Sequence, residues 1–393
     1  MPQLTSPDGS DSTQQAGVVA GAPAIKSTPP APKPASPRFH ELDALRAGAM
    51  LLGIVLHAFL FLIPDAWPIQ HSDPPALVYW IGLNVIHGFR MPVFFLLSGF
   101  FTAMLWERRG LRQLALHRGK RIALPLALCC ITVIPVNTWA FIGSEFSFGF
   151  WPFYWLYGFH HLWFLWILLW LGAAFLVLAR LGVQFSHPAL WWLLVPLALA
   201  PQYFMHEPVV GPDTSDGLVP HPLVVGYYAC FFFFGAFFYR RRFIMRRWWA
   251  LGLLPALLLV FPVAFVLLFP EEEVAWALPV SAVFQVVYAW LLCFGLIGLF
   301  RLIASRERPW VRYVSDSSYW LYLWHLPLIV FAQRIVLDWP ISPHLKFVLI
   351  CVTVTAILLA TYQLGVRNSP IGAVLNGRRL RERRSLAVAR RES

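Results

Sequence analysis

Apolar residues fill runs of membrane length along most of the chain, separated by short polar stretches. About 20 mainly apolar residues are enough for a helix to cross a bilayer. The pattern predicts ten spans, although Pro196 and Pro201 interrupt the fifth. The predicted spans cover residues 44–63, 77–105, 122–141, 162–180, 189–205, 222–239, 249–269, 278–300, 318–337 and 345–365. We therefore expect an all-α, polytopic membrane protein with about ten transmembrane helices.

The second predicted span is too long for one straight helix. Arg90, Met91 and Pro92 lie near its middle. A proline inside a helix removes a backbone hydrogen bond and bends the helix. We expect a bend at these three residues.

The spans lie between two polar ends of the chain. Residues 1–37 are rich in Pro, Ala, Ser and Gly and contain no apolar run. That composition is typical of a disordered tail and not of a signal peptide. Residues 367–393 form a basic tail. Between them we expect one transmembrane domain over residues 38–366, with no separate soluble domain.

The charge of the loops alternates along the chain. The stretches 107–121, 240–247 and 301–312 are rich in arginine, and the loop after the fourth span contains only Arg180. The intervening loops contain no Lys or Arg; they cover residues 64–76, 142–161, 206–221, 270–277 and 338–344. Because basic loops stay in the cytoplasm, the pattern predicts that both termini are cytoplasmic.

Composition narrows the class of partner. The 393 residues are 59% hydrophobic and 13% charged, with a net charge of +12. The positive charge could suggest nucleic acid, but the arginine clusters separate apolar runs, which favours a lipid bilayer. The 5 cysteines all fall inside apolar runs, so we expect no disulfide framework and no metal site.

Candidate chemistry begins in the first span, where His57 is the only strongly polar side chain between Ala47 and Ile63. Arg46 lies eleven residues earlier, about 16 Å away on the same face of a helix. An ionisable residue at membrane depth is costly unless it faces protein or a water-filled cavity. His57 is therefore a functional-site hypothesis, and the alternative is a packing histidine bonded to a neighbouring helix.

Further ionisable residues fall at membrane depth on other predicted spans. They are His87 and Arg90, the pair His160 and His161, and the group Tyr319, Tyr322 and His325. Four helices that each contribute such residues indicate one polar cavity. Two alternatives stay open. Either histidine of the pair can be interfacial, and Arg90 can snorkel or cap a break at Pro92.

Two motifs need a separate interpretation. Ser98, in Leu97-Ser98-Gly99-Phe100, lacks the surroundings of a nucleophilic serine, and small residues in membrane helices favour close helix packing. Arg118 and Arg121 are three residues apart at the entrance to the third span. They suit a clamp for the phosphates of a nucleotide-bearing donor; the alternative is ordinary cytoplasmic charge.

Four runs occur in a specific order: LDALRAGAMLLGIVLH, FRMPVFFLLSGFF, HHLWFLWIL and SYWLYLWHLPL. Together they resemble the membrane acyltransferase 3 family over roughly residues 38–366. Within that family the chain is most similar to the branch that succinylates periplasmic glucans in Gram-negative bacteria. It departs from that branch at Trp324, where the branch has a second histidine.

The resemblance implies an O-acyltransferase of the bacterial inner membrane. Its donor substrate would be cytoplasmic acyl-CoA, as succinyl-CoA or acetyl-CoA, and its acceptor a hydroxyl of a glucan or other glycan on the periplasmic side. The essential arginine and histidine of the family's first helix fall on Arg46 and His57. The basic motif falls on Arg118 and Arg121, and the histidine of the ninth span falls on His325.

An acceptor hydroxyl must lose a proton as it attacks a thioester, and a neutral histidine can accept that proton. We assign this role to His57, with Arg46 beside the donor phosphates or neutralising charge. Tyr322 or His325 would stabilise the oxyanion, and His161 is a further catalytic candidate. Arg118, Arg121 and Arg90 are the expected CoA-binding residues.

Two rival functions remain. A proton-coupled transporter or flippase also needs histidine and arginine at membrane depth, but it predicts internal repeats, and the sequence shows none. A structural scaffold leaves these polar residues unexplained.

Overall fold

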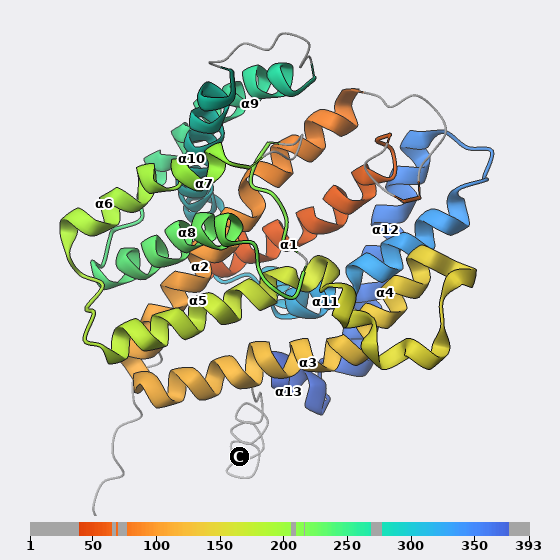
Figure 1. The fold of residues 1–393 in the computed structure, drawn as a ribbon, viewed down its shortest axis with the longest axis horizontal. Coiled ribbons are helices and arrows are strands. Elements are labelled where there is room, and N and C mark those ends of the chain that lie inside the picture. The colour runs from red at the N-terminus through yellow and green to blue at the C-terminus, as the bar shows by residue number, and fades with distance from the viewer. Residues whose placement is uncertain are drawn as a thin grey trace, which may run out of the picture. The chain divides into compact units, whose positions relative to one another are not determined.

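The computed structural model describes residues 39–64, 68–69, 77–205, 210–215, 217–268 and 277–376. The expected N-terminal tail, the basic tail beyond Asn376 and most of the loops 64–76 and 270–277 lie outside the described residues. Within the described part every regular element is a helix (Figure 1). The all-α prediction is therefore confirmed for this part of the chain.

Long helices follow one another in the order of the predicted spans. They are α1 (His40–Leu60), α2 (Leu77–Arg118), α3 (Leu124–Ile131), α4 (Val133–Ile142), α5 (Trp163–Arg180), α6 (Pro188–Leu197), α7 (Leu199–Tyr203), α8 (Pro222–Arg240), α9 (Leu253–Leu268), α10 (Ala277–Ile303), α11 (Pro309–Val336), α12 (Pro343–Thr361) and α13 (Pro370–Asn376). Short 3₁₀ and π segments join them: η1 (Gly119–Ala123), η2 (Gly143–Glu145), η3 (Phe148–Tyr157), η4 (His160–Leu162), η5 (Arg247–Gly252) and η6 (Tyr362–Val366).

The predicted number of ten membrane spans stays a prediction. Among the described residues, 6 helical stretches are long and apolar enough to cross a bilayer, and one of them, Leu77–Ile131, contains a break at Gly110. This stretch covers the second predicted span and the first half of the third, which lie on either side of the break. The fifth is split into α6 and α7 near Pro196, and α11, which covers the ninth, contains His325, Gln333 and Arg334 among its apolar residues.

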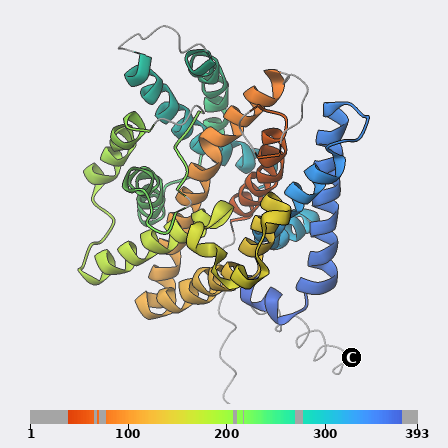
Figure 2. The ribbon, with the colours of Figure 1, turned by 45° about the vertical axis from the view of Figure 1, so that its right-hand side comes forward.

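Helix α1 lies between α2 and the pair α11 and α12 in both views (Figures 1 and 2). It runs parallel to α11, because Arg46 Nη2 donates to Ser315 Oγ (3.3 Å) near one end and Gln333 Nε2 donates to the His57 carbonyl (3.1 Å) near the other. Helix α12 returns antiparallel to α11 and is the more peripheral of the two. Only 4 of its 19 residues are buried, compared with 13 of the 28 in α11.

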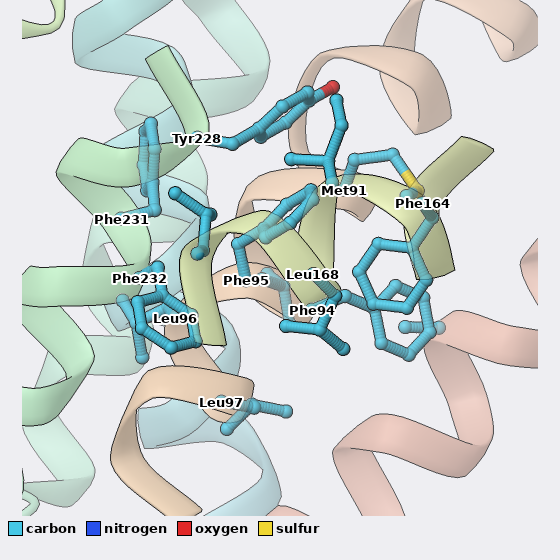
Figure 3. Packing of buried hydrophobic residues seen from close by; sticks show 14 of the residues in the cluster. Met91, Phe94, Phe95, Leu96, Leu97, Phe164, Leu168, Tyr228, Phe231 and Phe232 are labelled. Carbon is cyan, nitrogen blue, oxygen red and sulfur yellow. The ribbon is translucent and has the colours of Figure 1, made fainter. Parts of the chain in front are cut away.

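Helices α2 and α8 pack with their backbones in direct contact. A Cβ atom at Gly99 would overlap the Phe232 carbonyl, and one at Gly235 would overlap the Leu96 carbonyl. Beside this contact the ring of Phe95 stacks on Tyr228, with 4.3 Å between centroids (Figure 3). The Ser98-Gly99 motif therefore serves close helix packing, as the sequence predicted.

The break in α2 lies at Gly110, whose φ of 75° is outside the helical region, while the helix continues through Pro92. The expected bend at Arg90, Met91 and Pro92 stays a prediction, and the break that the structure shows lies at Gly110. Positive φ is readily adopted only by glycine. Beyond the break the chain folds back, so that Arg118 Nη2 donates to the Ser98 carbonyl (3.2 Å) and to Thr102 Oγ1.

Candidate active site

The candidate site forms where η4 docks on α11, and Pro327 explains the position. Proline has no N–H, so the carbonyl four residues earlier, that of Leu323, lacks its helical donor. His161 Nε2 donates to this carbonyl (3.1 Å), and Tyr322 Oη donates back to the His161 carbonyl (2.8 Å). Two reciprocal hydrogen bonds thus fix His161 against α11.

Three histidines from different elements meet beside this contact. The ring centroid of His325 lies 5.2 Å from that of His57 on α1 and 5.0 Å from that of His161. His325 and His161 are both buried. The structure thus brings together three predicted catalytic histidines, and Tyr322 lies among them, 5.7 Å from the ring of His161.

Hydrogen bonds fix the tautomers of two neutral histidines. A carbonyl oxygen can only accept, so His325 donates from Nδ1 to the Tyr322 carbonyl (2.7 Å) and His161 donates from Nε2 to Leu323. The second ring nitrogens, His325 Nε2 and His161 Nδ1, have no hydrogen-bond partner among the described residues. Both therefore present a lone pair, which suits proton acceptance.

This arrangement changes the expected oxyanion donors. In the neutral state His325 offers an acceptor at Nε2, and the Tyr322 hydroxyl already donates to the His161 carbonyl. Neither residue has a proton aimed at a reacting carbonyl. Both residues proposed for oxyanion stabilisation thus make other contacts in this structure.

The neighbouring His160 takes a different direction. Its φ of 47° is in the left-handed region, which is uncommon outside glycine. Its Nε2 lies 3.1 Å from Thr138 Oγ1 on α4, and the Thr138 hydroxyl donates to the Ile134 carbonyl (3.0 Å). His160 therefore anchors η4 to α4, while His161 enters the histidine cluster.

Gln333 is a site residue that sequence reasoning missed. The last four carbonyls of a helix lack helical donors, and the carbonyl of His57 is in the last turn of α1. Buried Gln333 supplies the donor from α11. A glutamine within an apolar run was the available signal. It holds the end of α1 that carries His57.

Arg90 lies in the histidine cluster and not among the residues expected to bind CoA. A Cβ at Gly53, one turn before His57, would overlap Arg90 Nη1 and would lie 3.7 Å from His325 Nε2. His87, one turn earlier on α2, points elsewhere and donates from Nδ1 to the Val210 carbonyl (3.0 Å). Of these two polar residues, Arg90 is the one beside the candidate base.

The remaining predicted residues gather near the opposite end of α1. Arg46 lies 3.5 Å from Asp43 and is partly exposed, and its charge repels that of Arg121 on η1. The Arg121 carbonyl accepts a hydrogen bond from Tyr319 Oη (2.6 Å). Arg118 is instead occupied by its bonds to α2. Arg46 and Arg121 therefore form a positive site separate from the histidines.

A protein-family comparison decides the class of this molecule. The model described as the acyltransferase domain of the acyltransferase 3 family matches residues 39–363. The chain belongs to this family. It is a membrane acyltransferase that transfers groups other than aminoacyl groups, and the matched segment contains all eight predicted site residues. None of the described residues form a set of three or more His, Cys, Asp or Glu placed to hold a metal ion.

Among curated proteins the acyltransferase is similar to the glucans biosynthesis protein C of Salmonella paratyphi B, Salmonella heidelberg and Salmonella agona. Each is 37% identical over 105 residues, which cover 26% of this chain and 26% of the relative. The aligned segment thus spans about a quarter of these relatives. No solved structure matches the chain.

Proposed function

We propose that this acyltransferase moves a succinyl or acetyl group from cytoplasmic acyl-CoA to a hydroxyl of a glucan or other glycan on the periplasmic side of the bacterial inner membrane. The observation that carries the proposal is the cluster of His57, His161 and His325 within the helices, connected along α1 to the positive site at Arg46 and Arg121. A base inside the membrane domain and an anion site at its edge suit a hydroxyl acceptor and a polyphosphate donor.

In the proposed reaction the acceptor oxygen attacks the thioester carbonyl carbon and forms a C–O bond. His57 accepts the hydroxyl proton, the C–S bond breaks, and the departing sulfur takes up the proton as the CoA thiol. His161 and His325 border the same space with unprotonated ring nitrogens. These neutral rings make the surroundings of His57 polar without adding a negative charge next to it.

The donor phosphates are placed at Arg46 and Arg121. Two like charges that repel each other are stabilised by an anion bound between them. Arg118 lies in the same arm of the chain, but its bonds to Ser98 and Thr102 make it the residue that fixes this arm against α2. In this proposal Arg118 acts on donor binding by holding Arg121 in place.

The glycan acceptor rests on the similarity to glucans biosynthesis proteins and on the placement of the histidines beyond Arg46 along α1. Purified protein with acyl-CoA and a glucan acceptor tests the function. We expect CoA release that depends on the glucan, and ester-linked acyl groups on the product by mass spectrometry. A transporter would leave the thioester intact, and this outcome would contradict the proposal.

Arg121→Ala should raise the KM for acyl-CoA with little change in acceptor dependence, because the phosphates lose a charged partner worth about 1.5–3 kcal/mol, or roughly 10- to 150-fold. Initial rates over a range of donor concentrations measure this effect. Arg118→Ala is the matched comparison: it should lower thermal stability and raise the donor KM less than Arg121→Ala does, because Arg118 acts only through the position of Arg121. An unchanged donor KM in Arg121→Ala protein that is normally inserted would refute the phosphate assignment.

The proposed topology places both termini in the cytoplasm. The parallel α1 and α11 and the antiparallel α12 have the relative directions that alternating spans require. Single cysteines introduced at Glu145 and Arg242 into a chain lacking the native cysteines should react with a membrane-impermeant maleimide from opposite sides of the membrane. Labelling of both from the same side would exclude this topology.

A further inference from the structure

The space occupied by the Arg90 guanidinium exists because residue 53 has no side chain. Gly53 is buried on α1, one turn before His57. A Cβ atom there would overlap Arg90 Nη1 and lie 3.4 Å from Arg90 Cζ. The Arg90 guanidinium thus packs against the backbone of α1 at Gly53. Any residue with a side chain at position 53 would displace it.

The same space borders the histidines. The position of that absent Cβ is 3.7 Å from His325 Nε2, the ring nitrogen that has no partner among the described residues. The guanidinium is therefore held against Gly53 at the edge of the cluster, near His325. An arginine offers five N–H donors in a rigid, permanently charged group.

Arg90 is also incompletely paired. Its Nε is buried without a hydrogen-bond partner in the described part of the chain. Burying a cation without a carboxylate is costly. This cost is offset when a negative charge forms nearby during the reaction.

We infer that Gly53 is a positioning residue, which leaves the space in which Arg90 is aimed at the oxyanion of the acyl-transfer reaction. The inference rests on the proposed function. As the acceptor oxygen bonds to the thioester carbon, the carbonyl electron pair moves onto oxygen, and an Arg90 N–H donates to that oxygen. The pair returns when the C–S bond breaks. Arg90 supplies the donor that Tyr322 and His325 do not.

Gly53→Ala tests the positioning role. Loss of one oxyanion donor typically lowers kcat about 10²–10³-fold, so we expect this loss for Gly53→Ala and for Arg90→Ala, with the KM for acyl-CoA changed less than threefold. The matched control is Gly172→Ala on α5, also a buried helical glycine but with no atom within 4 Å of its Cβ position. It should retain wild-type turnover.

A double variant separates positioning from general damage to the fold. If Gly53 acts through Arg90, adding Gly53→Ala to Arg90→Ala should cause no further loss, because the overlap no longer exists. A further loss equal to that of Gly53→Ala alone would overturn the inference. If the Gly53→Ala protein does not accumulate, the double variant still can, because removing the Arg90 side chain makes room for the added methyl group. Turnover by the double variant is then compared with turnover by Arg90→Ala alone, and equal values support the positioning role.

Comparing two acyl donors shows whether Arg90 binds the oxyanion or the carboxylate of a succinyl group. Both succinyl-CoA and acetyl-CoA develop an oxyanion, so Arg90→Ala and Gly53→Ala should slow both donors equally. A loss confined to succinyl-CoA would assign Arg90 to the succinyl carboxylate and overturn the inference. Wild-type protein that shows no transfer would instead refute the proposed function. Active wild-type protein with a fully active Gly53→Ala variant would refute only the positioning role.

Discussion

His57→Gln should lose about 10²–10⁴-fold in the rate of acyl transfer, the typical contribution of a general base. Glutamine keeps a polar side chain of similar size but cannot accept a proton at neutral pH. Its amide fits beside His325, and the bond from Gln333 to the backbone carbonyl of residue 57 does not depend on the side chain. We therefore expect the variant to insert, fold and bind acyl-CoA nearly as the wild type does.

The measurements are acyl transfer, thermal stability in detergent and acyl-CoA binding for His57→Gln and His57→Ala. His187→Gln, a substitution at an exposed histidine before α6, is the control. If His57 only packed against α11, glutamine would be tolerated and alanine would act through lower stability. Near-wild-type transfer by His57→Gln would remove His57 as the base and move the role to His161 or His325.

Gly235→Ala should prevent accumulation of folded protein. The added methyl group meets the Leu96 carbonyl of α2 and also lies 3.0 Å from the Phe100 backbone nitrogen. Backbone atoms cannot rotate away as a flexible side chain can, so α8 must separate from α2. Overpacking of this kind costs about 1–3 kcal/mol or more, and here it also loosens the aromatic cluster around Phe95.

Gly226→Ala is the matched control because it is the same substitution on the same helix. Its Cβ position has no atom within 4 Å, and alanine has the higher helix propensity. Size-exclusion profiles and melting temperatures in detergent compare the two variants. Equal yields and melting temperatures would show that α2 and α8 do not depend on the close approach seen at Gly99 and Gly235.

The relation between Arg46 and His57 could be predicted from the sequence because both lie on one continuous helix. Helical geometry fixes the distance between them and places both on one face of α1. The structure shows that α11 contacts this helix. The choice between His160 and His161 could not be predicted. It depends on the positive φ of His160 and on the carbonyl that Pro327 leaves unpaired at residue 323. Both are contacts between distant parts of the chain.

Arg118 shows the limit of a motif. Its spacing from Arg121 suits a phosphate clamp, but the left-handed backbone at Gly110 turns the arm so that the Arg118 guanidinium bonds to α2. A lone glycine in a polar loop carries too weak a signal to predict that turn. The hydrogen bonds of Tyr322 and His325 could not be predicted for a related reason, since tautomers depend on carbonyl partners that periodicity does not reveal.

The docking of His161 on α11 determines when the site first exists during synthesis. Its acceptor carbonyl, at Leu323, is made 162 residues after the histidine. At about 5–20 residues per second, the ribosome needs roughly ten seconds or more to reach it. Until α11 has entered the bilayer, η4 has no surface to dock on and His57 has no partner ring. A nascent chain therefore has no assembled histidine cluster before α11 is made.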